Sequence, residues 1–162
     1  MTITPAEAAN LLALNAAHET ETSPLTPAIL KQLLANSWHL GLAGTHGYDG
    51  FLIALNDSSD HPGINFQWFK TRYPRFVYID RIIVSAAARG RGVARTLYGE
   101  LFRRAAAEGV PMIGCEVNSD PPNPASDAFH ERLGFAEVGQ AALPGGTKLV
   151  RYLARPTSNW PG

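Results

Sequence analysis

The sequence predicts an α/β protein with a mixed sheet, and three observations lead to this fold class. Helical and strand patterns occur in the order helix, helix, strand, strand, strand, helix, strand, helix, strand, strand. One strand, RFVYIDRIIV at Arg75–Val84, is apolar at both alternating sets of positions, which predicts burial on both faces. The composition of 162 residues, 45% hydrophobic and 17% charged, indicates one domain spanning residues 1–162.

Two helices and a hairpin are predicted at the start of the chain. Prolines at helix-start positions and apolar residues at helical spacing predict helices over Pro5 to about His18 and Pro27 to about Asn36. The stretch Trp38–Leu55 has apolar segments broken by glycines, which predicts two strands joined by a turn near Gly44–Gly50. Residues 56–75 mix turn formers with aromatic side chains and are predicted to form a structured loop.

The strand Arg75–Val84 must be covered on both sides. Strict alternation assigns one set of its side chains to one face, namely Phe76, Tyr78, Ile82 and Val84, and the other set to the opposite face, namely Val77, Ile79 and Ile83. An amphipathic helix is predicted next, from about Gly92 to Gly109.

A strand, a helix and a final pair of strands complete the predicted order. The strand is Pro111–Asn118. Asn123 is the expected N-cap of the helix, which ends before Gly134. The last two strands are expected at about Phe135–Ala142 and Thr147–Ala154, joined by the turn LPGG.

Charge and cysteine content exclude several function classes. Fourteen basic and fourteen acidic residues give a net charge of zero, so no global field attracts nucleic acid or an anionic membrane, and neither is expected as a partner. The single cysteine, Cys115, cannot form an internal disulfide, and no zinc motif is present, so we expect no bound metal and a cytoplasmic protein. No apolar run approaches the ~18 residues that span a bilayer.

The turn ARGRG before the helix at Gly92 has the composition of an anion site. A helix N-terminus presents free N–H groups, and glycines at positions 90 and 92 let a phosphate approach them, while Arg89 or Arg91 adds a charge-assisted bond. The alternative is a tight connection with solvated arginines. A nucleotide P-loop and a dinucleotide-binding motif are excluded, because GxxxxGK[ST] does not occur and Arg95 stands at the third glycine of GxGxxG.

Three segments together resemble the GNAT superfamily of acyl-CoA-dependent N-acyltransferases: DRIIVSAAARGRGVARTLYGEL, CEVN and NPASDAFHERLGF. The resemblance covers about Phe76–Val138. It implies a GNAT-like α/β fold: a mixed, mostly antiparallel sheet with splayed central strands and flanking helices. Two positions depart from the family pattern, since Ala87 stands where the family has Gln or Arg and His130 stands where it has tyrosine.

The resemblance also implies the cosubstrate and its binding residues. Acetyl-CoA would place its pyrophosphate on the amides of Arg89, Gly90, Arg91, Gly92, Val93 and Ala94. Its pantetheine arm would lie along Ile82, Ile83 and Val84, where that strand splays from Cys115–Asn118. Asn123 and Ser126, on the polar stripe of the following helix, would line the cofactor; the alternative is that this stripe faces water.

The reaction needs a proton acceptor, because an amine with a pKa near ~10.4 is mostly protonated at neutral pH. Asp80, on the same predicted face as Ile82 and Val84, and Glu116, in the partner strand, are the candidates. A salt bridge with a basic residue of the aromatic loop is the alternative role for Asp80.

Departure of the thiolate is assisted by a proton donor, and His130 is the candidate as acid or thiol-orienting group. Tyr78 and Tyr98 are further hydroxyl donors that are easier to interpret as packing residues. Cys115 as an acyl-carrying nucleophile is the less favoured alternative to a buried structural thiol.

The acceptor is expected to be a small-molecule or peptide amine. The aromatic segment INFQWFKTRYPRF forms either a wall of its site or a cover for the sheet. Glu19 and Glu21 either meet a cationic acceptor or lie in a solvated connection. The predicted function is N-acetyl transfer by direct attack, and the alternative is a non-catalytic acyl-CoA-binding sensor or regulatory module; a homodimer is compatible with either.

Overall fold

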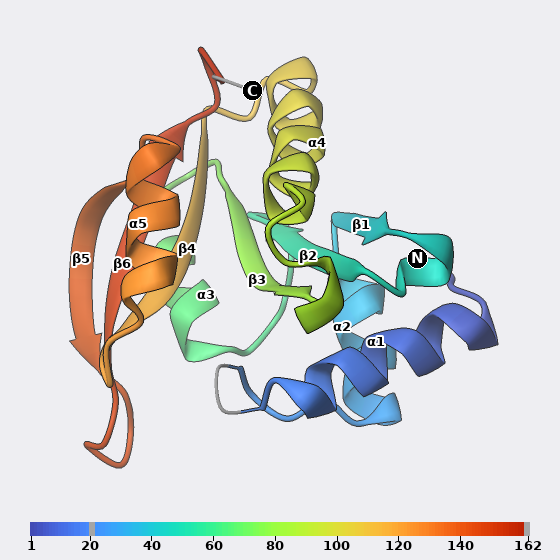
Figure 1. The fold of residues 1–162 in the computed structure, drawn as a ribbon. Coiled ribbons are helices and arrows are strands. Elements are labelled where there is room, and N and C mark those ends of the chain that lie inside the picture. Colours follow the sequence, from blue (N-terminus) through green and yellow to red (C-terminus); the bar gives the residue numbers. More distant parts are fainter. Residues whose placement is uncertain (20–21, 161–162) are drawn as a thin grey trace.

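The computed structural model describes residues 1–19 and 22–160 and contains one six-stranded sheet of order β1-β2-β3-β4-β6-β5 (Figure 1). Its strands are β1 (His39–Ala43), β2 (Gly50–Asn56), β3 (Val77–Val84), β4 (Met112–Asp120), β5 (Ala136–Ala142) and β6 (Leu149–Pro156). Every neighbouring pair is antiparallel except β3 and β4, which are parallel. The predicted mixed, mostly antiparallel sheet is therefore confirmed.

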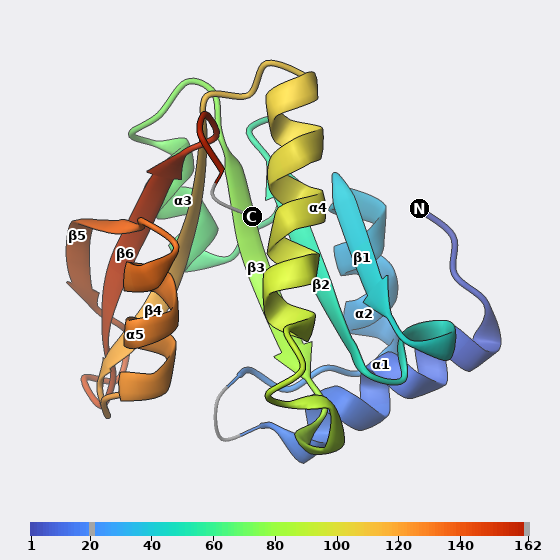
Figure 2. The same ribbon diagram turned by 45° about the horizontal axis from the view of Figure 1, so that its top comes forward.

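Helices cover both faces of this sheet (Figure 2). They are α1 (Pro5–Ala17), α2 (Pro27–Asn36), α3 (Ile64–Lys70), α4 (Val93–Ala107) and α5 (Pro124–Arg132), with short 3-10 turns at Thr45–Gly47 and Ala86–Ala88. Apolar side chains of α4 and the end of α5 form one core with one face of the sheet, and those of α1, α2 and α3 form a second core with the other. None of the helices that the structure describes is long and apolar enough to cross a bilayer.

Helix starts follow the capping chemistry of the sequence. Thr4 and Glu7 form a reciprocal capping box at α1, and the Thr26 side chain accepts from the Ile29 amide at α2. Asn123 caps α5 as predicted, with its side chain accepting from the Ser126 amide at 3.3 Å. Between α1 and α2, Glu19 is exposed and Glu21 lies outside the described residues.

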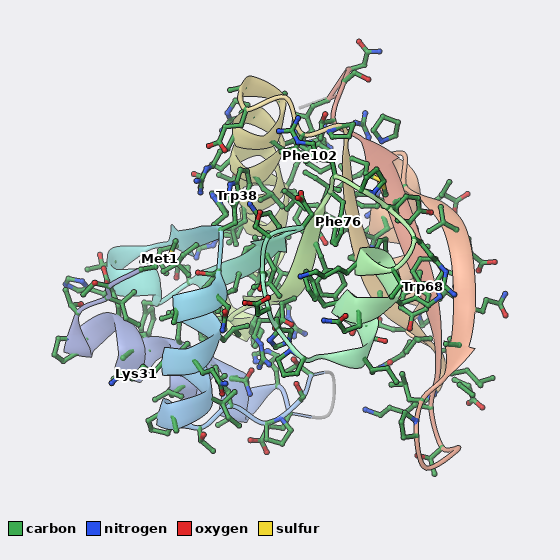
Figure 3. All side chains as sticks on the ribbon, turned by 180° about the vertical axis from the view of Figure 1, so that it is seen from behind. Met1, Lys31, Trp38, Trp68, Phe76 and Phe102 are labelled. Atoms are coloured by element: carbon green, nitrogen blue, oxygen red, sulfur yellow. The ribbon has the colours of Figure 1, made fainter. Side chains whose placement is uncertain are left out.

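The prediction of a loop over residues 56–75 is wrong in part, because α3 lies within it. The N-cap of this helix is Gly63, which has no side chain to accept a capping hydrogen bond, so capping gave no signal for it. Its stability comes from packing: Phe66 and Phe69, three residues apart, are both buried. Trp68 stacks on Tyr152 of β6 at 4.1 Å between ring centroids, and Figure 3 shows it against the last strands.

A β-bulge in β3 overturns the predicted alternation of that strand. Ile53 of β2 pairs with Arg81 and Ala54 pairs with Ile79, so Asp80 is the extra residue between them. Beyond the bulge the faces exchange. Ile82 therefore packs with the α4 core, whereas Tyr78 and Ile83 belong to the core under α1–α3. The expectation that Tyr78 and Ile82 share a face is wrong.

The parallel strands β3 and β4 are paired at one end only. Their ladder consists of Val77 with Ile113 and Tyr78 with Gly114, while β4 stays paired with β6 to its last residue, Asp120. β3 likewise remains bonded to β2 through Val84. Each strand is thus held on its outer edge while the inner edges diverge, as Figure 1 shows. This is the predicted splay of the central strands.

Gly114→Ala is expected to destabilise the fold at this branch point. A Cβ at position 114 would lie 2.3 Å from Cε1 of Phe69, whose ring is fully buried. We expect the free energy of unfolding to fall by about 1–3 kcal/mol in urea denaturation. Phe69→Leu makes space for the added methyl group, so the double variant should lose less than the sum of the single variants. Additive losses would contradict this contact.

Candidate active site

A cavity of about 1080 Å³ occupies the gap between the diverging strands β3 and β4. It brings together most of the predicted site residues: Asp80, Ile82, Ile83, Val84, Arg89, Ala94, Glu116, Asn123, Ser126 and His130. Of the remaining predicted residues, Gly90, Arg91, Gly92 and Val93 form the turn and first residue of α4 that lead up to Ala94. The sequence therefore identified a set of side chains that the fold gathers in one place.

The turn before α4 has the backbone geometry of an anion site. Gly90 and Gly92 have φ of 78° and 75°, in the left-handed region that favours glycine, and a Cβ at either would meet nothing within 4 Å. The Thr96 amide donates to the Gly92 carbonyl at 3.0 Å. The amides of Val93 and Ala94 precede this bond, in the part of a helix whose N–H groups have no intrahelical acceptor. Open space thus adjoins these donors.

Two basic residues, Arg89 and Arg91, belong to this turn. Arg91 forms an exposed ion pair with Asp49, at 3.5 Å between Nη2 and Oδ1. Arg89 lines the cavity. An exposed ion pair of this kind contributes little to stability. Arg91 can therefore leave the Asp49 carboxylate and bind a phosphate with only a small loss of free energy.

Glu116 is a partly buried carboxyl group in a polar cluster that lines the cavity. Asn65 of α3 donates to its Oε1 at 3.2 Å and the Tyr78 hydroxyl donates to its Oε2 at 3.4 Å. The Tyr152 hydroxyl in turn donates to the Asn65 side chain at 2.8 Å. Burial, with the nearby Asp80 charge, raises the pKa of Glu116 to about 8 against these hydrogen bonds. The group therefore exchanges its proton close to neutral pH.

Asp80 lies on the bulge, where its carboxylate forms an ion pair with Arg81 and lies close to the His61 ring. Its Oδ2 is 3.2 Å from Nε of Arg81 and its Oδ1 is 3.5 Å from Nε2 of His61. Arg81 is itself anchored, because it donates to the Asn15 side chain of α1 at 2.6 Å. The alternative of a salt bridge for Asp80 is thus present, and His61 comes from the segment before α3. The side chain still reaches the cavity, with 12% of its surface exposed.

His130 is buried in the cavity wall with both ring nitrogens engaged. Nδ1 is 2.7 Å from the Ser126 carbonyl oxygen, and Nε2 is 2.7 Å from the Tyr98 hydroxyl of α4. Burial lowers the pKa of His130, so the ring is neutral at physiological pH. The alternative that its helix stripe simply faces water does not hold for His130, which is 6% exposed.

Asn123 and Asp127 have structural partners, and the cysteine is buried. Asn123 caps the helix, and Asp127 accepts from Arg151 of β6 at 2.7 Å. Cys115 is buried beside Glu116, and burial raises the pKa of its thiol well above the usual value. The thiol stays protonated, which favours the structural interpretation of this residue.

Sequence reasoning missed several groups of the site. Asn65 is a polar residue within the aromatic segment, and that contrast is a signal that could have identified it. Of the aromatic residues around it, Phe66 lines the cavity, while Trp68 and Phe69 cover the sheet. His61 belongs to no recognisable sequence pattern. Tyr98 occupies an apolar stripe of α4, where the sequence cannot distinguish a functional tyrosine from one that only packs in the core.

The two walls of the cavity differ in chemistry. Along β4, Cys115 faces the core under α4, whereas Glu116 contacts Asn65 of α3 on the opposite side of the sheet. The cavity therefore passes through the sheet, from the α4 and α5 side to the α1–α3 side. A ligand held at the N-terminus of α4 would enter from the first side and meet two carboxyl groups on the second. Among the described residues, no group of three His, Cys, Asp or Glu side chains is placed to hold a metal ion.

Comparison with known proteins places this geometry in a family. The profile described as "Acetyltransferase (GNAT) family" matches residues 42–135. No curated protein sequence matches the chain. Many solved structures share its fold.

Three of these structures illustrate the similarity. The ribosomal-protein-S18-alanine N-acetyltransferase from Escherichia coli has a TM-score of 0.68 at 16% identity, covering 98% of this chain and 92% of its own. The ribosomal-protein-alanine N-acetyltransferase from Brucella melitensis has a TM-score of 0.65 at 21% identity, covering 96% and 98%. An N-acetyltransferase from Staphylococcus aureus Mu50 has a TM-score of 0.68 at 19% identity, covering 96% of each chain.

Glu116→Gln is expected to stabilise the protein at alkaline pH. The ordinary pKa of the carboxyl is 4.5 and its pKa in the fold is about 8, so between these values the folded state binds more protons than the unfolded state. Stability of the wild type therefore falls as the pH rises through this window, by up to about 1.4 kcal/mol per pH unit. The amide does not titrate, so the variant should lack this decline.

Urea denaturation at pH 5 and pH 8 measures the effect. The exposed Glu131→Gln variant serves as the control and should keep the wild-type dependence. An unchanged pH dependence in Glu116→Gln would show that Glu116 does not carry the raised pKa.

Proposed function

The chain belongs to the acetyltransferase (GNAT) family, and from that premise we propose that it transfers an acetyl group from acetyl-CoA to a primary amine by direct attack of the amine on the thioester. One observation carries this proposal. A cavity between the unpaired edges of β3 and β4 joins an open helix N-terminus to a partly buried carboxyl group with a pKa of about 8. A phosphate site and a proton acceptor are the two functions that this reaction requires of the protein.

The residues around the α4 turn fit the cosubstrate. The amides from Gly90 to Ala94 would receive the pyrophosphate, since side-chain atoms leave the space beside Gly90 and Gly92 open. The Arg89 amide, predicted to join them, already donates to the Ala86 carbonyl at 3.4 Å. The backbone of Ile82–Val84 would bind the pantetheine arm along the cavity edge of β3. Asn123 and Ser126 would contact it from α5. Acetyl-CoA supplies the activated acyl group, and the chain supplies orientation and proton transfer.

Glu116 is the proposed general base. As a carboxylate it takes a proton from the incoming ammonium or from the nitrogen after attack, and its raised pKa brings its proton affinity closer to that of an amine. Asp80, held by Arg81 and His61, would attract the cationic acceptor through its charge. Both carboxyl groups lie toward α3, so the amine would enter from that side.

His130, predicted as the acid or thiol-orienting group, lies on the other side of the sheet. Because its ring proton is held by the Ser126 carbonyl, only the orienting role is kept for it here. The acceptor is a primary amine of a small molecule or a peptide. Two of the similar structures are N-acetyltransferases of ribosomal-protein alanine, which favours a peptide amine as the first acceptor to test. The wide cavity accommodates either class.

Release of free thiol tests the function. Pure protein is mixed with acetyl-CoA, a panel of amines that includes a peptide beginning with alanine, and a thiol reagent. We expect thiol release that depends on the amine, with mass spectrometry showing one added acetyl group on the acceptor. Saturable CoA binding without release under any amine would identify a non-catalytic binding module and overturn the proposal.

The pH profile tests the role of Glu116. We expect kcat/KM of the wild type to rise with pH and to show an inflection near 8, as the carboxylate forms. Glu116→Gln should lower kcat by about 100-fold and should lose this inflection. The inflection caused by deprotonation of the acceptor amine should remain. The exposed Glu131→Gln variant should behave as the wild type. An active Glu116→Gln enzyme with an unchanged profile would remove Glu116 from the mechanism.

Gly92→Ala tests the phosphate site. The change strains a backbone with φ of 75° by about 1–2 kcal/mol and places a methyl group beside the α4 amides. We expect KM for acetyl-CoA to rise at least fivefold with KM for the amine unchanged. Gly109→Ala at the other end of α4, where φ is 70°, imposes similar strain away from the site and is the matched control. Equal effects of the two variants on KM would show that strain alone is responsible.

A further inference from the structure

A tyrosine and a histidine from different helices form a buried pair in the cavity wall. Tyr98 of α4 is 1% exposed, and its hydroxyl oxygen lies 2.7 Å from Nε2 of His130 on α5. Phe129 and Phe135 pack against the Tyr98 ring at 5.3 and 6.0 Å between centroids. Both members of the pair line the cavity. The Tyr98 hydroxyl is therefore fixed at a surface that faces the ligand space.

The hydrogen bonds of His130 determine which member holds a transferable proton. The Ser126 carbonyl can only accept, so Nδ1 of His130 carries the ring proton and donates it there at 2.7 Å. Because the ring is neutral, Nε2 has no proton and accepts from the Tyr98 hydroxyl. The proton of the imidazole is thus bound to the backbone. The proton of Tyr98 is held by a side chain that can release it when the hydroxyl rotates.

The Tyr98–His130 pair lies on the side of the sheet where the thiol would leave, and not on the side where the amine would enter. Tyr98 belongs to the helix whose first turn is the phosphate site, and it lies in the same core as Cys115 and Ile82. Glu116 lies on the opposite side of the sheet with Asn65. A thioester that enters along α4 would place its sulfur toward Tyr98 and its carbonyl carbon toward Glu116.

On the basis of the proposed function, we propose that the Tyr98 hydroxyl donates the proton to the departing sulfur, and that His130 is a positioning residue that holds this hydroxyl in place. As the tetrahedral adduct collapses, the C–S bond breaks and its electron pair stays on sulfur. The O–H proton of Tyr98 moves to that sulfur, giving the free thiol of CoA, and the phenolic oxygen keeps the O–H pair. The nitrogen of the adduct has meanwhile given one proton to Glu116. Transfer of that proton to the Tyr98 oxygen through cavity water returns both groups to their starting states.

The environment supports donation from a phenol. Burial raises the pKa of Tyr98 well above its usual value, so the hydroxyl is protonated at neutral pH. A thiolate formed in the same wall also has a raised proton affinity, as the raised pKa of the Cys115 thiol shows. Burial therefore shifts donor and acceptor in the same direction, and the proton transfer stays feasible.

Tyr98→Phe is the direct test, because it removes one oxygen and keeps the ring packing. We expect kcat with acetyl-CoA to fall by about 100-fold and KM for acetyl-CoA to change less than twofold. His130→Phe should give a smaller loss, of about tenfold, since the hydroxyl remains but is no longer held. Circular dichroism and thermal melting verify that both variants are folded.

A thioester with a better leaving group separates proton donation from a structural role. S-phenyl thioacetate releases thiophenol, which is more acidic than the thiol of CoA. Its thiolate therefore needs less protonation as it departs. We expect the wild-type to Tyr98→Phe rate ratio to shrink at least tenfold with this thioester. A ratio that is the same for both thioesters would mean that Tyr98 acts through packing alone. Wild-type kcat in Tyr98→Phe, combined with a large loss in His130→Phe, would assign donation to His130.

Failure of the proposed function has a different signature. It appears in the wild type, as absence of amine-dependent thiol release, and the donor role falls with it. Failure of this inference alone leaves the wild type active and shows only in the variants, as a wild-type to Tyr98→Phe rate ratio that is the same for both thioesters.

Discussion

The site depends on one constraint of the sheet: two parallel strands are bonded to each other at one end and to antiparallel partners along their outer edges. The two pairs Val77–Ile113 and Tyr78–Gly114 fix the branch point. Beyond it, β2 and β6 satisfy the outer edges of β3 and β4, so the strands diverge without losing the rest of the ladder. The inner edges are left as open backbone donors and acceptors next to the cavity. A ligand with amide groups of its own can satisfy them.

Divergence also explains how neighbouring residues reach opposite reactants. Successive strand residues point to opposite faces. In a closed sheet Cys115 and Glu116 would be separated by the strand and its partner, but at an open edge one cavity reaches both faces. The bulge at Asp80 adds to this effect, because it directs that carboxylate toward His61 and the α1–α3 side. The polar groups of the reaction are thereby sorted by face, with carboxyl groups on one side and the hydroxyl–imidazole pair on the other.

The sequence was informative where local chemistry decides the structure. The order of elements other than α3, the Asn123 cap and the glycine turn before α4 follow from residue type and spacing, and the structure confirms them. Three features could not be predicted because each is a property of pairing. The bulge at Asp80 requires the register with β2, and α3 requires the surface on which Phe66 and Phe69 pack. The role of Tyr98 requires His130, which lies 32 residues away.

Placing His130 in a family tyrosine position raises the question of what replaces the missing hydroxyl, and the packing of α4 against α5 bears on it. An imidazole is shorter than a phenol, and its proton is held by the Ser126 carbonyl. The Tyr98 hydroxyl fills the space beyond the ring and is hydrogen-bonded to it. Two residues on two helices thus provide what one longer side chain would provide from α5. The arrangement costs a buried hydrogen-bonded pair, but it ties the donor to the same helix that receives the phosphates, so one rigid element positions both ends of the reactive arm.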